Sequence, residues 1–138
     1  MQYSISTDKS KLDIKEIHDY LCNKSYWAKG RSLDAVKKSI ENSICFGVYD
    51  SKGNTLGFAR VVTDEVVYAY LLDLFIFEEF QGRGLGTMLI KHILEQKYLQ
   101  VRLWFLATKS AHGLYEKFGF STVTDPERLM FKRDEKYS

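Results

Sequence analysis

The stretch Gln81-Gly82-Arg83-Gly84-Leu85-Gly86-Thr87 places three alternating glycines at a point where an apolar strand pattern changes to a helical one. Glycine lacks a Cβ atom, so the backbone can turn several N–H groups toward one point while a ligand approaches closely. The partial positive charge of a helix start adds to those donors, and Arg83 adds a full charge. The stretch therefore predicts a binding site for an anion such as a pyrophosphate or a 3′-phosphate.

Two common phosphate-binding loops do not fit this stretch. A G-x-G-x-x-G fingerprint needs glycine where the chain has Thr87 or Leu89, depending on the starting glycine. A Walker loop needs a lysine, and the stretch has none. The remaining alternative is a glycine-rich turn without a ligand. We disfavour it because glycines destabilise a helix start unless something offsets them.

The elements around the glycine stretch predict a βαβ unit. Upstream, Val66 to Phe77 is an almost wholly apolar run, typical of a central strand. Downstream, an amphipathic helix ends near Gln96, and Val101 to Ala107 follows as a buried strand. The helix is marked by Leu85, Met88, Leu89 and Ile93. We expect the two strands to be parallel and the crossover right-handed.

The first half of the chain predicts helices followed by a hairpin. Tyr3–Thr7 alternates like a short strand, and Asp13 and Ser32 stand where N-caps of two helices are expected. Ile44–Tyr49 and Thr55–Thr63 then form a hairpin.

The end of the chain continues the alternation of helix and strand. Ser110–Lys117 predicts a short helix closed by Gly119, with weaker strand signals near Ser121–Val123 and Leu129–Lys132. The expected fold is α/β (α+β): one domain over residues 1–138. It has a central mixed, mostly antiparallel sheet containing the parallel βαβ unit, flanked by about four helices.

Composition limits the classes of function. The chain has 138 residues, 45% of them hydrophobic, 28% charged, and a net charge of +2, as in one globular domain without affinity for nucleic acid. The start lacks a secretory pattern, and no stretch approaches membrane-spanning length, so we expect a cytoplasmic protein without a membrane partner. Cys22 and Cys45 are far apart and predict free thiols, and no metal site is expected.

A second motif, Ala111-His112-Gly113-Leu114-Tyr115-Glu116-Lys117-Phe118-Gly119-Phe120, follows the glycine stretch. The Gln-x-x-Gly-x-Gly spacing at 81–86 resembles the acyl-CoA pyrophosphate loop of the GNAT superfamily, and the second motif closely resembles its Ala-x-x-Leu-Tyr-x-x-x-Gly-Phe segment. The resemblance covers about residues 44–120 well. Residues 58–64 and 106–108 look like blocks of a bacterial subfamily with undefined acceptors. The resemblance implies an N-acetyltransferase that moves an acetyl group from acetyl-CoA to a primary amine by direct transfer in a ternary complex.

The resemblance also implies cofactor-binding residues. In the superfamily the pantetheine arm pairs with the central strand, and the glycine loop holds the pyrophosphate. Thr108 stands where many members carry asparagine, so a hydroxyl replaces an amide there. The implied residues are Leu74, Phe75, Ile76, Phe77, Gln81, Gly82, Arg83, Gly84, Leu85, Gly86, Thr87 and Thr108.

Tyr115 and Asp73 are the implied catalytic residues. Tyr115 matches the tyrosine that donates a proton to the departing thiolate, and the alternative is a core tyrosine that packs the short helix. Asp73 is the only acid between Val66 and Phe77. It either attracts or deprotonates the acceptor amine, or is a structural residue bonded to backbone donors or a buried cation.

The implied acceptor site involves Tyr26, Trp27 and Arg31, in the connection between the first two helices, and Tyr70 on the central strand. Alternatively, Trp27 covers the core and Tyr70 fills the opposite sheet face. A small-molecule amine is favoured as acceptor, and a protein amine stays open. A non-catalytic acyl-CoA sensor and a ligand-free interaction domain are the rival functions, and a homodimer is compatible with each.

Overall fold

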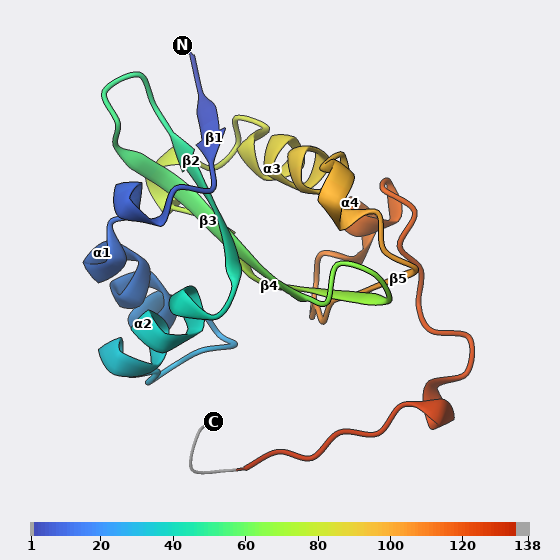
Figure 1. Cartoon of the computed structure of the whole chain (residues 1–138). Helices are drawn as coiled ribbons and strands as arrows, with labels where there is room; N and C mark the ends of the chain where they lie inside the picture. The colour runs from blue at the N-terminus through green and yellow to red at the C-terminus, as the bar shows by residue number, and fades with distance from the viewer. Residues whose placement is uncertain (1, 135–138) are drawn as a thin grey trace.

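The computed structural model describes residues 2–134 and contains one five-stranded sheet in the order β1-β2-β3-β4-β5 (Figure 1). The strands are β1 (Ser4–Ser6), β2 (Ile44–Tyr49), β3 (Thr55–Thr63), β4 (Tyr68–Ile76) and β5 (Leu103–Phe105). The α-helices are α1 (Ile14–Asp19), α2 (Leu33–Glu41), α3 (Leu85–Leu94) and α4 (His112–Glu116). A π-turn over Tyr20–Lys24 continues α1. Neighbouring strands are antiparallel except β4 and β5, which are parallel and joined through α3. The predicted mixed sheet with one βαβ unit is confirmed.

Local signals placed the N-terminal elements correctly. The Asp13 carboxylate accepts a hydrogen bond from the Glu16 N–H at 3.2 Å, and the Ser32 hydroxyl accepts one from the Ala35 N–H at 3.1 Å. Both residues are the N-caps of their helices, as predicted. The hairpin strands also have the predicted bounds. Among residues 2–134, no helix is long and apolar enough to cross a membrane.

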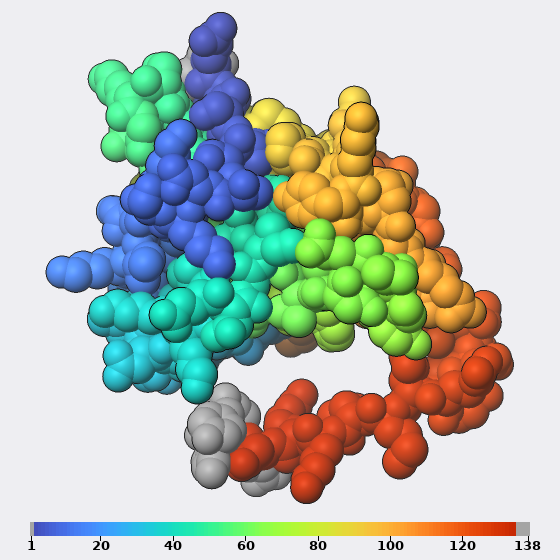
Figure 2. Space-filling model, viewed as in Figure 1, coloured from blue at the N-terminus to red at the C-terminus, as the bar shows by residue number. Residues whose placement is uncertain are grey.

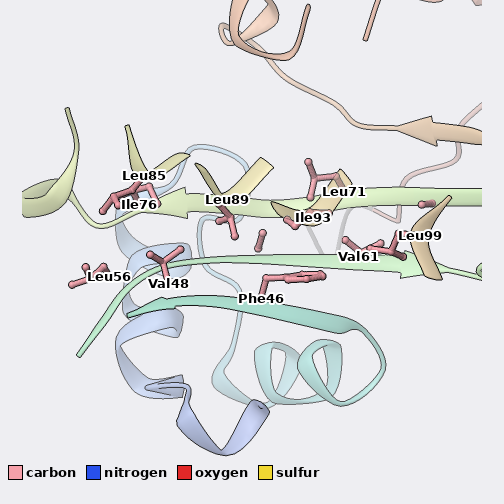
Figure 3. Close-up of a cluster of buried hydrophobic side chains, with 12 residues drawn as sticks. Phe46, Val48, Leu56, Val61, Leu71, Ile76, Leu85, Leu89, Ile93 and Leu99 are labelled. Atoms are coloured by element: carbon pink, nitrogen blue, oxygen red, sulfur yellow. The ribbon is translucent and has the colours of Figure 1, made fainter. Parts of the chain in front are cut away.

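The sheet lies between two helical layers. On one face α3 packs against the strands, and Figure 3 shows its leucine and isoleucine side chains against β2, β3 and β4. On the other face α1 and α2 cover a second buried cluster. The first cluster contains Phe46, Val48, Leu56, Ala59, Val61, Ala69, Leu71, Ile76, Leu85, Leu89, Ile93 and Leu99. The second contains Ile17, Leu21, Ala28, Val36, Ile40, Cys45, Phe58, Phe75 and Phe77.

A β-bulge in β4 changes which residues face each layer. The register with β3 shifts between the pairs Arg60–Leu72 and Phe58–Phe75, and Asp73 at the bulge has a φ of 51°. Before the bulge Leu71 packs in the α3 layer, whereas after it Phe75 packs against α1 and α2. An extra residue reverses the strand's alternation. From Leu71 to Ile76 residues on both faces are buried or half-buried, which explains why this part of β4 is apolar apart from Asp73.

The structure differs from the sequence predictions after β4. β5 is only three residues long, because it pairs with β4 at Tyr68, Ala69 and Tyr70 alone. The strands predicted near Ser121–Val123 and Leu129–Lys132 are absent from the described chain, so that prediction is wrong. Both segments are exposed and run outside the sheet. A strand needs a partner with which to pair its backbone, and an alternating sequence does not supply one.

Candidate functional site

The glycine loop ends in a helix start with unused backbone donors. Gly82 and Gly84 have φ values of 81° and 78°, which side-chain-bearing residues rarely adopt. A Cβ atom at either glycine would meet nothing within 4 Å, so the space in front of the loop is open. Gly84 is the N-cap of α3, and no side chain caps it. The first helical hydrogen bond of α3 runs from the Met88 N–H to the Gly84 carbonyl. The N–H groups of residues 85–87 therefore have no acceptor within the helix.

Two side chains hold the loop in place. The Gln81 amide nitrogen donates to the carbonyl oxygen of Ile76 at 2.9 Å, which ties the loop to the end of β4. The Arg83 guanidinium lies 5.5 Å from the centre of the Phe80 ring, and its Nη1 is 3.4 Å from the Tyr3 hydroxyl. Arg83 therefore stands beside the uncapped helix start as a cation without a carboxylate partner among residues 2–134.

The edge of β4 beyond Tyr70 has no strand partner in the described chain. The Phe77 N–H is committed to β3, since it donates to the Leu56 carbonyl at 3.0 Å. Backbone groups alternate between the two edges of a strand, so those of Phe75 also face β3, while those of Leu74 and Ile76 face the free edge. Of the four predicted strand residues, Leu74 and Ile76 thus carry N–H groups that an added ligand can reach.

Tyr115 lies on α4, the helix that follows β5 in the chain. Its half-buried ring packs on the α3-side core, 5.8 Å from the centre of the Phe120 ring. Burial, and to a lesser extent the nearby Tyr26, raise the pKa of Tyr115. The phenol therefore stays protonated at neutral pH and is available as an acid. Thr108, predicted to contact the cofactor, accepts a hydrogen bond from the Ala111 N–H at 3.0 Å and so shapes the turn before α4.

The connection between α1 and α2 reaches across to that same segment. The Tyr26 hydroxyl accepts a hydrogen bond from the Lys109 N–H at 3.1 Å, and Lys109 Nζ lies 5.7 Å from the centre of the Tyr26 ring. The ring of Tyr26 meets that of Trp27 edge-on at 5.2 Å. Tyr26 thus links the helical layer to the residues preceding Tyr115.

Asp73 is surrounded by donors. Its Oδ1 accepts from Trp27 Nε1 at 2.8 Å, and its Oδ2 accepts from Arg31 Nη1 at 2.8 Å and Arg60 Nε at 2.7 Å. Only 2% of its side chain is exposed. Burial by itself raises the pKa of Asp73, but the two guanidinium charges and the hydrogen bonds outweigh that effect and lower it. Asp73 is thus an ionised, buried carboxylate bonded to two partly buried guanidinium groups, the kind of contact that the structural alternative expects.

The structure brings the predicted acceptor residues together only in part. Trp27 and Arg31 meet at Asp73, whereas Tyr70 is exposed on β4 and makes no hydrogen bond or ring contact with them among the described residues. Sequence reasoning missed Arg60 and Lys109. The sequence could have indicated Arg60 as a partner of Asp73, because Arg60 is the only charged residue of β3, the strand that pairs with β4.

Comparisons with known proteins identify the family of the chain. Residues 41–122 match the family model of the GNAT acetyltransferase domain. A Prochlorococcus marinus protein named as an N-acetyltransferase of the ycf52-like type is 37% identical over 127 residues, covering 87% of this chain and 69% of its own. The ycf52 N-acetyltransferase of Gracilaria tenuistipitata var. liui is 34% identical over 123 residues, covering 83% of this chain and 67% of its own.

Solved structures show the same fold. A GNAT-family crystal structure from Xanthomonas campestris has a TM-score of 0.93 at 38% identity and covers 97% of this chain and 94% of its own. The N-acetylglutamate synthase of Neisseria gonorrhoeae, solved with coenzyme A and N-acetylglutamate, has a TM-score of 0.73 at 21% identity. It covers 92% of this chain and 30% of its own, and shows the fold alone. The chain therefore belongs to the GNAT family and is an acyl-CoA-dependent N-acetyltransferase.

Proposed function

We propose that the whole chain acts as one cytoplasmic N-acetyltransferase domain that moves an acetyl group from acetyl-CoA to a primary amine by direct transfer in a ternary complex. One observation carries the proposal: the short segment 77–84 joins the free edge of β4 to the uncapped amides at the start of α3. A ligand with an anionic end and an amide-bearing arm matches those two features. Acetyl-CoA has both and supplies the thioester.

The α3 start supports binding of the pyrophosphate. Its three free amides point out of a helix N-terminus, where anions are favoured by direct hydrogen bonds and by the helix dipole. The open space at Gly82 and Gly84 lets the phosphate oxygens approach the backbone. Arg83 supplies charge from the side. Gln81 acts indirectly, by fixing the loop to Ile76.

The free edge of β4 supports binding of the arm that carries the thioester. Leu74 and Ile76 face that edge, so the N–H and carbonyl groups of Leu74 and the N–H group of Ile76 can pair with the arm's amides as a neighbouring strand would, while the Ile76 carbonyl accepts from Gln81. The Leu74 N–H, beside the bulge, is the donor that we assign to polarising the thioester oxygen.

Tyr115 is the proposed acid. As the amine nitrogen bonds to the thioester carbon, the C–S bond breaks and the sulfur leaves as a thiolate, which the phenol protonates. An ordinary thiol has a pKa near 8.5, below that of the phenol, so this transfer is uphill in water. Burial raises the pKa of Tyr115, and it also raises that of a thiol beside it, so the departing thiolate is a stronger base there than in water.

A cysteine nucleophile has less support than direct transfer. Cys45 is buried, and burial raises the pKa of its thiol to about 11. A thiol with that pKa is almost entirely protonated at neutral pH and reacts poorly. An acyl-enzyme at Cys45 would also need the buried strand to open.

We assign Asp73 a positioning role rather than that of a base. Its ion pairs hold Trp27 and Arg31 against the bulge, and a carboxylate with a lowered pKa takes protons poorly. Tyr26, Trp27, Arg31 and Tyr70 stay our candidates for contacts with the acceptor. A small-molecule amine is favoured. A Salmonella typhimurium relative, 32% identical over 80 residues, is named as acetylating the alanine of ribosomal protein bS18, and so keeps a protein amine in consideration.

The test is Tyr115→Phe, assayed by thiol release from acetyl-CoA over a panel of amines. Loss of a general acid lowers kcat by about 10²- to 10⁴-fold, while the affinity for coenzyme A stays unchanged because the loop is intact. Tyr98→Phe is the matched control, since Tyr98 is another partly exposed tyrosine whose pKa burial raises. Equal turnover in wild type and Tyr115→Phe would remove the acid assignment.

The alternative is a non-catalytic acyl-CoA sensor, and one observation favours it: the ion pairs of Asp73 remove a candidate base from the site. Calorimetric titration with coenzyme A, combined with the thiol-release assay, separates the enzyme from the sensor. Binding together with thiol release supports the enzyme, and binding without release for any amine supports the sensor. If coenzyme A does not bind, both the enzyme and the sensor are wrong.

A further inference from the structure

The Arg31 guanidinium uses only one of its three nitrogen atoms within the described chain. Its Nη1 donates to Asp73 Oδ2 at 2.8 Å, whereas Nε and Nη2 have no hydrogen-bond acceptor among residues 2–134. These two nitrogens form one edge of the planar group and carry two parallel N–H bonds. That edge matches the two oxygens of a carboxylate, which arginine binds through paired hydrogen bonds. Since 26% of the Arg31 side chain is exposed, the group is accessible from outside the protein.

The Arg31–Arg60–Asp73 cluster carries one positive charge in excess, because two guanidinium groups share one carboxylate. Arg60 Nε donates to the same Asp73 oxygen at 2.7 Å, and Arg60 Nη1 donates to the Ser43 hydroxyl at 3.2 Å. In the part of the chain that the structure describes, neither arginine has a second carboxylate within ion-pair distance. Arg60 is the more buried of the two, with 13% of its side chain exposed. Arg31 is therefore the member of the cluster that can offer the excess charge to an anion.

The position of Arg31 is fixed before any ligand binds. Its N–H donates to the Ala28 carbonyl at 3.0 Å, and its carbonyl accepts from His18 Nε2 at 3.0 Å. Trp27 Nε1 donates to the other oxygen of Asp73 at 2.8 Å and so holds the carboxylate that orients the guanidinium. A group held in place in this way loses little conformational freedom when it binds an anion.

The cluster lies where the helices leave the sheet uncovered. Arg60 opposes Leu72 on β4, and Tyr70 lies two residues before Leu72, so these side chains share one face of the sheet. On that face Tyr70 is 40% exposed, and Val62 opposite it is 45% exposed. Figures 1 and 2 show the α1–α2 layer, blue to cyan, over one end of the sheet, with the lime-green β3–β4 turn beyond it. Tyr70 and the partly exposed Trp27 thus give the cluster aromatic neighbours that a small ligand can contact.

The cluster adjoins the place that we assign to the thioester. Asp73 immediately precedes Leu74, whose N–H is the proposed donor to the thioester oxygen. The pantetheine arm that carries the thioester has no charge, and the phosphates are assigned to the glycine loop. The anion that fits Arg31 therefore belongs to the acceptor.

We propose that the acceptor is a small amine with a carboxylate a few bonds from its amino group, and that the Nε–Nη2 edge of Arg31 binds this carboxylate. The inference rests on the proposed acetyl transfer and names its substrate class. The carboxylate takes no part in the transfer itself. The amine nitrogen replaces the sulfur on the acetyl carbon and loses a proton to water, and coenzyme A leaves as the thiol.

The excess charge of the cluster also discriminates among amines. Most amines are ammonium ions at neutral pH, and a positive site repels an ammonium ion that carries no negative group. A carboxylate on the same molecule offsets this repulsion and draws the molecule to Arg31. Amino acids are thus expected to be better acceptors than their uncharged analogues, and polyamines are expected to be poor ones.

The first experiment compares acceptors that differ in the charge of one group. Glycine, β-alanine and γ-aminobutyrate are each paired with the corresponding primary amide, and thiol release from acetyl-CoA is measured at equal concentrations of unprotonated amine. At least one acid is expected to exceed its amide in kcat/KM by about 10- to 100-fold, as for a hydrogen bond to a charged group. Amides as reactive as all three acids, or spermidine more reactive than every acid, overturn the proposal.

The second experiment changes the residue that reads the charge. Arg31→Gln removes the free edge but leaves Asp73 paired with Arg60, so the variant is expected to fold, which circular dichroism verifies. The ratio of kcat/KM between an acid and its amide should fall to near one in Arg31→Gln and stay intermediate in Arg31→Lys, which keeps the charge without the planar fork. Lys29→Gln removes an exposed charge from the same connection and should keep the wild-type ratio. A wild-type ratio in Arg31→Gln overturns the proposal.

Equilibrium binding separates failure of this inference from failure of the proposed function. If no amine is acetylated, the transfer is wrong, and calorimetric titration of the same acids and amides, with and without coenzyme A, tests the carboxylate site by itself. The acids are expected to bind the wild type at least tenfold more tightly than the amides and to lose this advantage in Arg31→Gln. Acids that bind no more tightly than amides refute the carboxylate site, even in a protein that acetylates other amines.

Discussion

Asp73, within β4, and Gly84, after its end, both have a left-handed backbone, but their surroundings differ in how far the polar groups are satisfied. Asp73, with a φ of 51°, lies at a bulge where every oxygen of its carboxylate is bonded to a donor from another element. Gly84, with a φ of 78°, starts a helix whose first amides have no acceptor. The bulge is a closed structural centre, whereas the loop is open and electropositive.

The difference shows how to recognise a ligand site. An acid alone in an apolar strand resembles a catalytic group in the sequence, yet Asp73 is neutralised by Arg31 and Arg60. Buried charges in folded proteins are usually paired, and here each oxygen of the Asp73 carboxylate already accepts a hydrogen bond. Unsatisfied donors beside open space are the better indicator, and they occur at the glycine loop.

The largest effect on stability is expected when Asp73 loses its charge. Asp73→Asn keeps the size of the side chain and its tolerance of positive φ, but leaves Arg60 buried without a counter-ion. Breaking a buried ion pair from one side costs about 3 kcal/mol of unfolding free energy. Urea denaturation measures this cost. Asp64→Asn, the same change at an exposed carboxylate that accepts only backbone hydrogen bonds, is the control and should change stability far less.

The pH dependence tests the same ion pairs. The pKa of Asp73 is lower in the folded protein than in the unfolded chain, so its stabilising contribution is complete above the unfolded value near 3.8. The contribution is lost as the pH falls through the lower, folded pKa. The stability difference between wild type and Asp73→Asn should therefore be constant from pH 5 to 8 and shrink below about pH 4. A difference that persists unchanged at pH 2 would show that charge is not its source.

An intermediate effect is expected at the open loop. Gly84→Ala places a Cβ in the left-handed region, at a cost of about 1–2 kcal/mol, and the loop relaxes away from the geometry that aims its amides. Affinity for coenzyme A, measured by calorimetry, should fall about tenfold, which corresponds to 1.4 kcal/mol. Gly53→Ala, at a φ of 85° in the β2–β3 turn with equally open space, carries similar strain and should leave affinity unchanged.

The smallest effect is expected from the charge beside the loop. Arg83→Gln removes one cation near the phosphates, and an exposed charge at a helix start contributes about 0.5–1 kcal/mol, or roughly two- to fivefold in affinity. The wild-type affinity should fall with added salt more steeply than that of the variant, because salt screens an exposed charge. Lys52→Gln, in the β2–β3 turn, is the control. Equal salt slopes would place Arg83 outside the phosphate site.

Local patterns were enough for much of the fold. The caps at Asp13 and Ser32, and the hairpin strands, depend on residues within a few positions of one another, and these predictions were confirmed. The predicted strands beyond Phe120 were wrong, because a strand exists only where an edge accepts it, and here residues 121–134 leave the edge of β5. The sequence left two roles open for Asp73 and could not name its partners, since Arg31 lies 42 positions away from it along the chain.

The sequence by itself determined the βαβ unit and the glycine loop, because alternating glycines before an amphipathic helix permit left-handed backbone turns that other residues rarely adopt, and the motifs at 81–86 and 111–120 indicated the family by resemblance. Only the tertiary structure decided that Asp73 is held by two arginines, that Phe77 is committed to β3 while Leu74 and Ile76 face a free edge, and that Tyr26 meets Lys109. Those facts depend on a bulge that reverses a strand's faces and on contacts between distant segments. No local sequence pattern predicts such contacts, because they form only when the helical layers have packed against the sheet.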